Sequence, residues 1–292
     1  MEKIAAFFKA LADAAAVVNQ FPTWLKLVCF VSLLYFLIFG GIFIFEYSKY
    51  AALLKTSALM SNLEKQALSG QPMAMIELSL SESPKAFDIL ASVLKTNPQD
   101  QVRQQAAVAL ANLHDPRKTQ ALGDALLAEK WEVAGACAQA LGRSNDPSAV
   151  PYLLRALQLH IDWVVAQKSA EALGNFPPSE QIAKALVTTM NEGESSFEAE
   201  AAKQSLVKFG RFSMPFLLAN IEETTSVQGF TQSVLALRIV GEHDAAKCVE
   251  SLKAADRRVA ADPAFDDAGR KRLRSEIEAA ERDLASKIAP AA

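Results

Sequence analysis

Three histidines are the side chains of this sequence best suited to proton transfer or metal binding, because each has an aspartate close by. The pairs are His114 with Asp115, His160 with Asp162, and His243 with Asp244. An imidazole beside a carboxylate can act as a general base or ligate a metal ion. All three pairs fall at expected helix ends, where aspartate caps free amides and histidine favours the C-terminal dipole. The capping interpretation is the stronger one, and we expect no catalytic residue and no metal site.

The cysteines and the lack of known catalytic motifs also argue against an enzyme. Cys29, Cys137 and Cys248 are far apart, show no metal-ligand spacing and give no disulfide framework. We expect them to be small buried apolar residues. Nucleophile-elbow, phosphate-loop and dinucleotide-binding motifs are missing from the sequence. We therefore expect a protein that is not an enzyme, with no cofactor and no small-molecule substrate.

Composition allows a large folded core and argues against a nucleic-acid partner. The chain has 292 residues, of which 51% are hydrophobic, enough for one large or two small domains. Its 30 basic and 33 acidic residues give a formal net charge of -3. A protein that binds nucleic acid usually carries a basic bias, so proteins are the expected partners.

A repeat of 31 to 33 residues dominates the second part of the chain. Leu110, Leu141, Leu173 and Leu206 fall in register in four similar segments. Each segment is followed by a break rich in proline, glycine or aspartate, and then by a second apolar segment such as 149–157 or 181–190. A helical hairpin cannot bury its apolar face alone, so this period predicts an all-α fold: an α-solenoid of about five hairpins over residues 72–260.

The breaks and the small residues suit such stacking. In the turn Asp146-Pro147, proline fits the first turn of the following helix and aspartate can cap its free amides. Alanines are frequent in the first segment of each repeat, for example at Ala106, Ala138 and Ala170. Small side chains there would allow neighbouring helices to approach closely.

The pattern A-x-A-L-G-x-x-x-D-P-x-A-V-P-x-L-L-x-A-L at 138–157 resembles HEAT-like repeats of the type found in phycobilisome lyases and many bacterial scaffold proteins. The segments 102–127, 165–190 and 198–223 resemble it more loosely. The resemblance covers roughly residues 72–260 and implies a solenoid fold, but fold does not carry function. A lyase-like or cofactor-maturation enzyme that uses the concave surface is the alternative to a non-catalytic scaffold.

One enzyme of similar architecture is deoxyhypusine hydroxylase, which binds a di-iron centre through His-Glu pairs in its first helices. The comparable positions here are Gln104-Gln105, Gly135-Ala136, Gln167-Lys168 and Glu200-Ala201. Iron needs imidazole and carboxylate donors that converge on one site. A di-iron enzyme is therefore not expected.

Ahead of the repeats, residues 27–45 form a run of nineteen residues without a charge. A helix of that length rises about 28 Å, close to the thickness of a bilayer core. The sequence predicts a transmembrane helix over 23–46 that contacts lipid through residues 24–46; a buried core helix or a cleaved signal peptide is the alternative. Residues expected inside the span include Leu27, Phe30, Leu34, Phe36, Ile38, Phe43 and Phe45.

The segments on either side of this span bear on its contacts and its orientation in the membrane. Residues 1–22 predict an amphipathic helix that contacts either lipid or protein, and residues 47–71 predict a helical stalk. Three lysines precede the span and three follow it within twenty residues, so charge does not fix the orientation. The unpaired cysteines favour a reducing compartment, and we expect a single-pass protein of a bacterial inner membrane with a cytoplasmic repeat domain.

The last segment, 261–292, predicts a helix that closes the solenoid, followed by a tail. One helical stripe there is apolar while the rest of the segment is charged, and a partner helix could occupy the same stripe. The stripe consists of Leu273, Ile277, Ala280, Leu284 and Ile288.

These observations favour a membrane-anchored scaffold or adaptor that binds other proteins, as an accessory subunit of a membrane protein complex or as an assembly factor for one. Second helices such as 149–159 and 180–190 are expected to line the concave side of the solenoid. The candidate partner-binding residues on them are Tyr152, Arg155, Gln158, Lys184 and Thr188.

Overall fold

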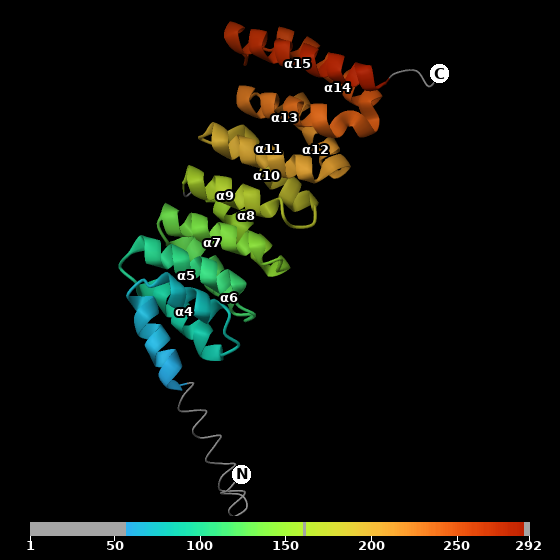
Figure 1. Cartoon of the computed structure of the whole chain (residues 1–292). Coiled ribbons are helices and arrows are strands. Elements are labelled where there is room, and N and C mark those ends of the chain that lie inside the picture. Colours follow the sequence, from blue (N-terminus) through green and yellow to red (C-terminus); the bar gives the residue numbers. More distant parts are fainter. Residues whose placement is uncertain (1–56, 160–161, 289–292) are drawn as a thin grey trace, which may run out of the picture. The chain divides into compact units, whose positions relative to one another are not determined.

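The structure, a computed structural model, describes residues 57–159 and 162–288, and every regular element in these ranges is a helix. The predicted membrane span at 23–46 and the amphipathic segment at 1–22 lie outside them. Within the described ranges, no helix has both the length and the apolar character that crossing a bilayer requires. The repeats form one compact unit that begins at Leu63 (Figure 1).

The predicted all-α solenoid is confirmed, with helices stacked in chain order as hairpins (Figure 1). The five expected hairpins are α5 (Asp100–Asn112) with α6 (Lys118–Ala128), α7 (Trp131–Arg143) with α8 (Val150–Gln158), α9 (Trp163–Leu173) with α10 (Glu180–Glu192), α11 (Ser196–Lys208) with α12 (Met214–Glu223), and α13 (Val227–Val240) with α14 (Ala245–Ala261). An earlier hairpin, α3 (Pro72–Ser79) with α4 (Pro84–Thr96), precedes them, and α15 (Asp267–Lys287) follows. Short 3-10 turns lead into α8, α12 and α14 at Pro147–Ala149, Gly210–Ser213 and Gly241–Asp244.

The helices form two layers. Helices α3, α5, α7, α9, α11, α13 and α15 each pack against the next member of the series and make up the first layer. Helices α4, α6, α8, α10, α12 and α14 do the same in the second layer. Across the layers, the second helix of one hairpin packs most extensively against the first helix of the next, as α6 does against α7 and α8 against α9. Every internal hairpin is therefore covered by a neighbour on both sides, as a solenoid requires.

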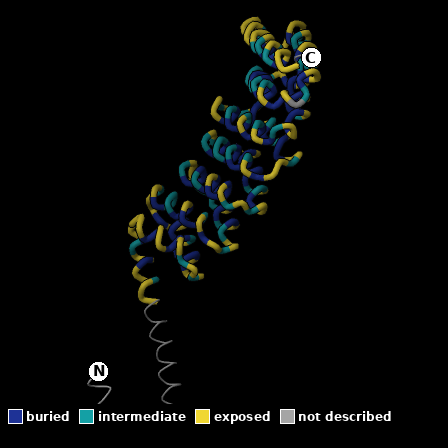
Figure 2. The backbone as a smooth tube through the Cα atoms, turned by 45° about the vertical axis from the view of Figure 1, so that its right-hand side comes forward, coloured by how far each residue is buried: buried dark blue, intermediate teal, exposed yellow. Residues whose placement is uncertain are grey.

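The core lies between the layers. The register residues Leu110, Leu141, Leu173 and Leu206 are completely buried, which confirms the alignment of the repeats. Figure 2 shows buried positions running through the middle of the stacked hairpins, with exposed positions at the turns and outer faces. Burying a leucine contributes about 1.5–3 kcal/mol, so each repeat adds a similar increment to the common core.

Small residues bring the first-layer helices close together near their C-terminal ends. A Cβ atom at Gly142 of α7 would lie 2.6 Å from Cβ of Ala172 on α9. A Cβ atom at Gly174, the residue after α9, would lie 2.4 Å from Oγ of Ser205 on α11. That serine hydroxyl donates a hydrogen bond of 2.8 Å to the carbonyl of Ala170. The chain thus needs small residues at these contacts, with glycine at 142 and 174, in agreement with the predicted close approach.

The turns confirm the predicted capping role of aspartate. The carboxylate of Asp146 accepts hydrogen bonds from the Ser148 amide at 3.0 Å and from the Thr119 hydroxyl of the preceding hairpin at 2.6 Å. Asp162 caps α9 by accepting from the Val164 amide at 2.8 Å. These bonds satisfy amides that the first turn of a helix leaves free.

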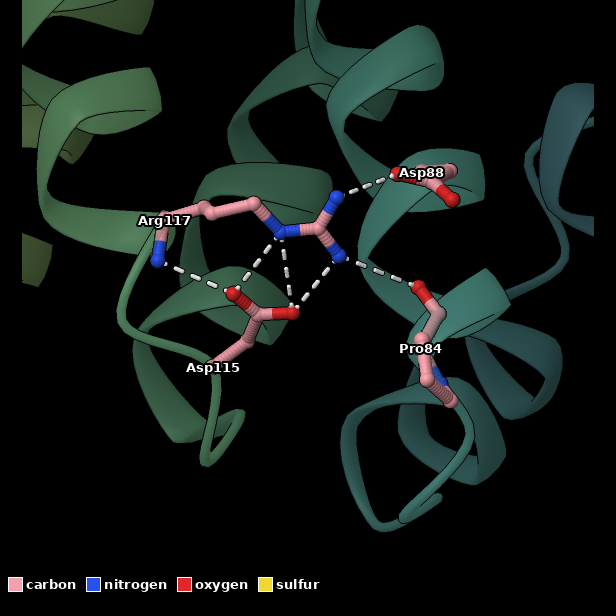
Figure 3. Close-up of polar contacts among 4 residues, drawn as sticks. All are labelled: Pro84, Asp88, Asp115 and Arg117. Atoms are coloured by element: carbon pink, nitrogen blue, oxygen red, sulfur yellow. Dashed lines mark hydrogen bonds and ion pairs between the residues drawn. The ribbon is translucent and has the colours of Figure 1, made fainter.

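A side-chain network at the turn after α5 ties that turn to the hairpin before it (Figure 3). Asp115 accepts hydrogen bonds from the Arg117 amide at 2.9 Å and from its guanidinium at 2.8 Å. The guanidinium also reaches Asp88 at 2.9 Å and the Pro84 carbonyl at 3.4 Å, and it lies 4.1 Å from the centre of the Phe87 ring. Successive repeats are therefore joined by polar contacts as well as by the core.

The two ends of the repeat unit differ from the sequence expectation in detail. Residues 57–68 are helical, and burial of Leu63 and Ala67 places the start of the packed unit ahead of residue 72, the boundary expected from the sequence. At the other end, α15 packs on α13 and α14. Four residues of its predicted apolar stripe are buried, whereas Ile288, just past the helix end, is 45% exposed.

Candidate protein-binding surface

The five residues predicted to bind a partner lie on second-layer helices α8 and α10. Arg155, Gln158, Lys184 and Thr188 are exposed, and Lys184 forms an ion pair of 2.6 Å with Glu180. Tyr152 is different, because it is only partly exposed and its ring occupies the space beside Gly123 of α6. A Cβ atom at Gly123 would lie 2.4 Å from Cδ1 of this ring. Tyr152 therefore packs α8 against α6.

The histidine–aspartate pairs show no arrangement that would do chemistry in the described residues. His114 is exposed, and the neighbouring Asp115 carboxylate is engaged by Arg117, whose hydrogen bonds hold the pKa of Asp115 below its ordinary value. His160 and the side chain of His243 lie outside the description, while Asp162 and Asp244 cap helices. In residues 57–159 and 162–288, histidine, cysteine and carboxylate side chains do not gather into a group that could hold a metal.

Two of the three cysteines can be followed in the structure. Cys137 and Cys248 are free and buried, as expected for small apolar residues. Burial raises the pKa of the Cys137 thiol to about 12 and also raises the pKa of Cys248. A nucleophilic cysteine requires a thiolate, and a raised pKa disfavours that form.

An apolar groove of about 420 Å³ crosses α5 on the outer side of the first layer. Ile76 of α3, Val108 of α5 and Ala136 of α7 line it, together with the amide side chains of Gln104, Gln105 and Gln139. Ile76 and Val108 are 51% and 42% exposed. We call this depression the α5 groove.

A second depression, of about 480 Å³, crosses α9 on the same layer and is polar. It is lined by Gln139 and Arg143 of α7, by Lys168, Glu171 and Asn175 in and after α9, and by Gln204 and Lys208 of α11. Gln139 lines both depressions, so they adjoin across α7. We call this second depression the α9 pocket, and the α5 groove and α9 pocket together the first-layer face.

The α9 pocket has an excess of positive charge. Lys168 is paired with Glu171 at 2.9 Å. Lys208 donates a hydrogen bond of 3.2 Å to the side-chain carbonyl of Asn175. In the part of the chain that the structure describes, neither Arg143 nor Lys208 lies in a salt bridge. Arg143 and Lys208 are therefore two positive charges without an acidic partner among the described residues, and they border a pocket lined with amide side chains.

A row of exposed aromatic side chains marks the N-terminal ends of three consecutive first-layer helices. Trp131 begins α7, Trp163 begins α9, and Phe197 lies in the first turn of α11. Their exposed fractions are 47%, 41% and 59%, and the rings of Trp163 and Phe197 are 5.7 Å apart between centroids. Tryptophan and arginine are the residues most often found as energetic centres of protein interfaces.

Part of this row is visible as a regular spacing in the sequence. Trp131 precedes the register residue Leu141 by ten positions, and Trp163 precedes Leu173 by the same interval. The same position holds Asp100 before Leu110 and Ser196 before Leu206, so this signal is confined to two of the four repeats. The five predicted residues, by contrast, share only their location on second helices.

Comparison with known proteins agrees with the geometry of the hairpins. A family model described as HEAT repeats matches residues 121–207, which confirms the resemblance in this part of the chain. A solved structure of the complex of CpcE and CpcF of phycocyanin lyase from Nostoc sp. PCC7120 is similar at a TM-score of 0.40 and 16% identity, over 74% of this chain and 94% of that chain. No curated protein sequence matches this chain. Residues 121–207, from α6 through most of α11, thus resemble HEAT repeats, and further helical hairpins continue the stack on both sides.

Proposed function

We propose that this protein is a non-catalytic HEAT-repeat scaffold that binds another protein along its first-layer helices, at the aromatic row of Trp131, Trp163 and Phe197 and at the first-layer face. The observation that carries the proposal is the exposed aromatic row at the N-terminal ends of α7, α9 and α11, on the helices that also form the α9 pocket. An exposed indole loses contact with water when a partner covers it, which stabilises the complex. Exposed apolar groups gathered in this way on a folded surface are typical of interaction sites.

The second-layer positions have a subordinate role in this proposal. Arg155, Gln158, Lys184 and Thr188 are exposed polar side chains, and Lys184 already has an ionic partner. Rim contacts of this type contribute little to binding energy compared with desolvated aromatic anchors. We assign the main contact to the first layer.

The proposal includes a membrane anchor at residues 23–46, supported by the nineteen uncharged residues from 27 to 45. The repeat unit would then be held beside a membrane, facing the cytoplasm, with a subunit of a membrane complex as its partner. In that setting the chain would serve as an accessory subunit or an assembly factor.

Site-specific photo-crosslinking in native cells tests the binding face. A photoreactive residue is placed at Gln139 on α7, and as a matched control at Gln120 on α6, since both glutamines are exposed on helices. We expect one partner species to be crosslinked from position 139 and not from position 120. Trp163→Ala should weaken the crosslink more than Trp163→Phe. Crosslinking from position 120 alone, or equally from both, would contradict the assignment.

Alkaline carbonate extraction tests the anchor separately. The full chain should stay in the membrane pellet, because an integral helix is not released when ionic contacts are broken. A variant in which residues 23–46 are deleted should appear in the supernatant. Release of the full chain would contradict the anchor proposal and would leave the assignment of the binding face unchanged.

A further inference from the structure

The two depressions of the first-layer face differ in chemistry, since the α5 groove is apolar and the α9 pocket has an excess of positive charge. This difference indicates the chemistry of the partner. The α5 groove offers exposed Ile76 and Val108, whereas the α9 pocket offers uncompensated Arg143 and Lys208. We infer that the face binds an extended peptide segment that places apolar side chains over α5 and a carboxylate over α9. The inference rests on the proposed function, because it takes the first-layer face to be the binding surface.

The charges of the α9 pocket select an acidic group. The whole chain has a net charge of -3, so the excess of cations is a local feature. Basic residues in the last turn of a helix complement its dipole, which accounts for Arg143 and Lys208 one at a time. The dipole does not require cations from α7 and α11 to border one hollow. A carboxylate there would gain charge-assisted hydrogen bonds, which are about twice as strong as neutral ones.

The amide side chains of the face select an extended main chain. Gln104, Gln105, Gln139 and Gln204 border the two depressions, and each carries both a donor and an acceptor. The buried Oε1 atom of Gln105 has no hydrogen-bond partner among the described residues. An extended peptide presents free amide and carbonyl groups that such side chains can bond, whereas a helix has already paired its own.

The distance between the two depressions fixes the length of the segment. Helices α5 and α9 are separated by α7 in the first layer, and packed helices lie about 8–10 Å apart, so the two centres are about 16–20 Å apart. An extended chain advances about 3.3 Å per residue. The apolar residues and the carboxylate should therefore be separated by about five or six residues.

Fluorescence anisotropy with synthetic peptides tests the inference. The probe carries two leucines, a five-residue Gly-Ser spacer and three glutamates, and it is titrated with the full-length chain in mild detergent, with empty micelles as a blank. Changing the three glutamates to glutamines should weaken binding about tenfold or more, as expected for the loss of a charge-assisted contact. Shortening the spacer to one residue should weaken it to a similar extent.

Two double variants remove the same formal charge from different faces. Arg143→Gln with Lys208→Gln should weaken binding of the acidic probe about tenfold or more. The control, Lys85→Gln with Lys95→Gln on second-layer helix α4, should change it by less than about twofold, since both lysines are exposed. Thermal unfolding of both variants checks that neither loses its fold. Amidated and free-acid probes distinguish a side-chain carboxylate from a terminal one.

Three outcomes would overturn the inference: equal binding of the glutamate and glutamine probes, equal loss in both double variants, and binding that ignores spacer length. If cells still yield a partner crosslinked at Gln139 while the probes fail, the peptide chemistry is wrong and the binding face stands. If the crosslink forms only at Gln120, the face itself is wrong, whatever the probes show.

Discussion

Two glycines of α7 show how the same residue type serves different purposes within one helix. A Cβ atom at Gly142 would meet both Cβ and Cα of Ala172, at 2.6 and 2.7 Å. A Cβ atom at Gly135 would lie 3.7 Å from its nearest neighbour, in ordinary contact with Val164. The backbone of α9 stands in the way at the first position, while the second has room for a methyl group.

The substitutions Gly142→Ala and Gly135→Ala should therefore have opposite effects on the free energy of unfolding. Overpacking at Gly142 should cost about 1–3 kcal/mol. At Gly135 the gain in helix propensity should stabilise the fold by about 0.5–1 kcal/mol. Urea denaturation of both variants gives the comparison. Equal effects would mean that α7 and α9 are not as close at their C-terminal ends as the structure has them.

Periodicity in the sequence predicts which residues are buried far better than which surface residues are used. Leu141 and Leu173 could be assigned to the core because apolar residues recur at one position of the repeat. Tyr152 was expected on an open surface, because nothing in the pattern reveals that Gly123, 29 positions earlier, leaves room for its ring. The aromatic row was missed because its members interrupt no motif. Burial can be predicted from the local spacing of apolar residues, whereas these surface contacts depend on which repeats become neighbours.

At the scale of elements, the aspartate before α8 joins two hairpins as well as capping a turn. Asp146 accepts a hydrogen bond from the Thr119 hydroxyl of α6 and another from the Ser148 amide. These bonds stabilise the carboxylate, so they lower the pKa of Asp146, with Thr119 as the largest cause. The Asp-Pro turn was predictable from sequence as a cap, but its bond to the preceding hairpin was not.

Asp146→Ala should destabilise the protein by about 0.5–2 kcal/mol at pH 7, the usual cost of losing a cap. A carboxylate whose pKa is lowered on folding contributes stability above its unfolded pKa, near 4, and loses that contribution as the pH falls through the folded value. The difference between wild type and variant should therefore shrink at pH 3. Urea denaturation at the two pH values measures it, with Asp124→Ala on the exposed side of α6 as a control. A difference that is unchanged at pH 3 would show that the carboxylate charge is not involved.

At the scale of the repeat unit, α15 closes the C-terminal end. One face of this helix is apolar and buried, and the other is charged and exposed. Leu273, Ile277 and Leu284 are buried against the last hairpin, and Arg238 of α13 forms an ion pair with Asp283. The residues between α14 and α15 also contribute, since Phe265 is buried with its ring edge-on to Phe230, 6.3 Å away between centroids. The exposed residues of α15 include Lys271, Arg272 and Glu278. The apolar stripe and the charged remainder of this helix are both local features of the sequence, so neither depends on knowing which repeats become neighbours.

Removal of residues 262–292 should expose the apolar surfaces of α13 and α14. Solenoids need a polar terminal element to stay soluble, so we expect the truncated chain to bind a hydrophobic dye and to self-associate. Dye fluorescence and sedimentation velocity measure the two effects. A chain shortened only by residues 289–292 serves as the control and should behave as wild type. A long truncation that remains monomeric and binds no dye would show that α15 is not the closing element.

The aromatic row has a practical consequence, because the chain contains only three tryptophans: Trp24, Trp131 and Trp163. The last two begin successive first-layer helices and are each more than 40% exposed, so their indoles lie largely in water. Indole emission moves to shorter wavelengths when water is excluded. A partner that covers the N-terminal ends of α7 and α9 would therefore shift the intrinsic emission of the protein, and stopped-flow recording of that shift would follow association in real time without a label.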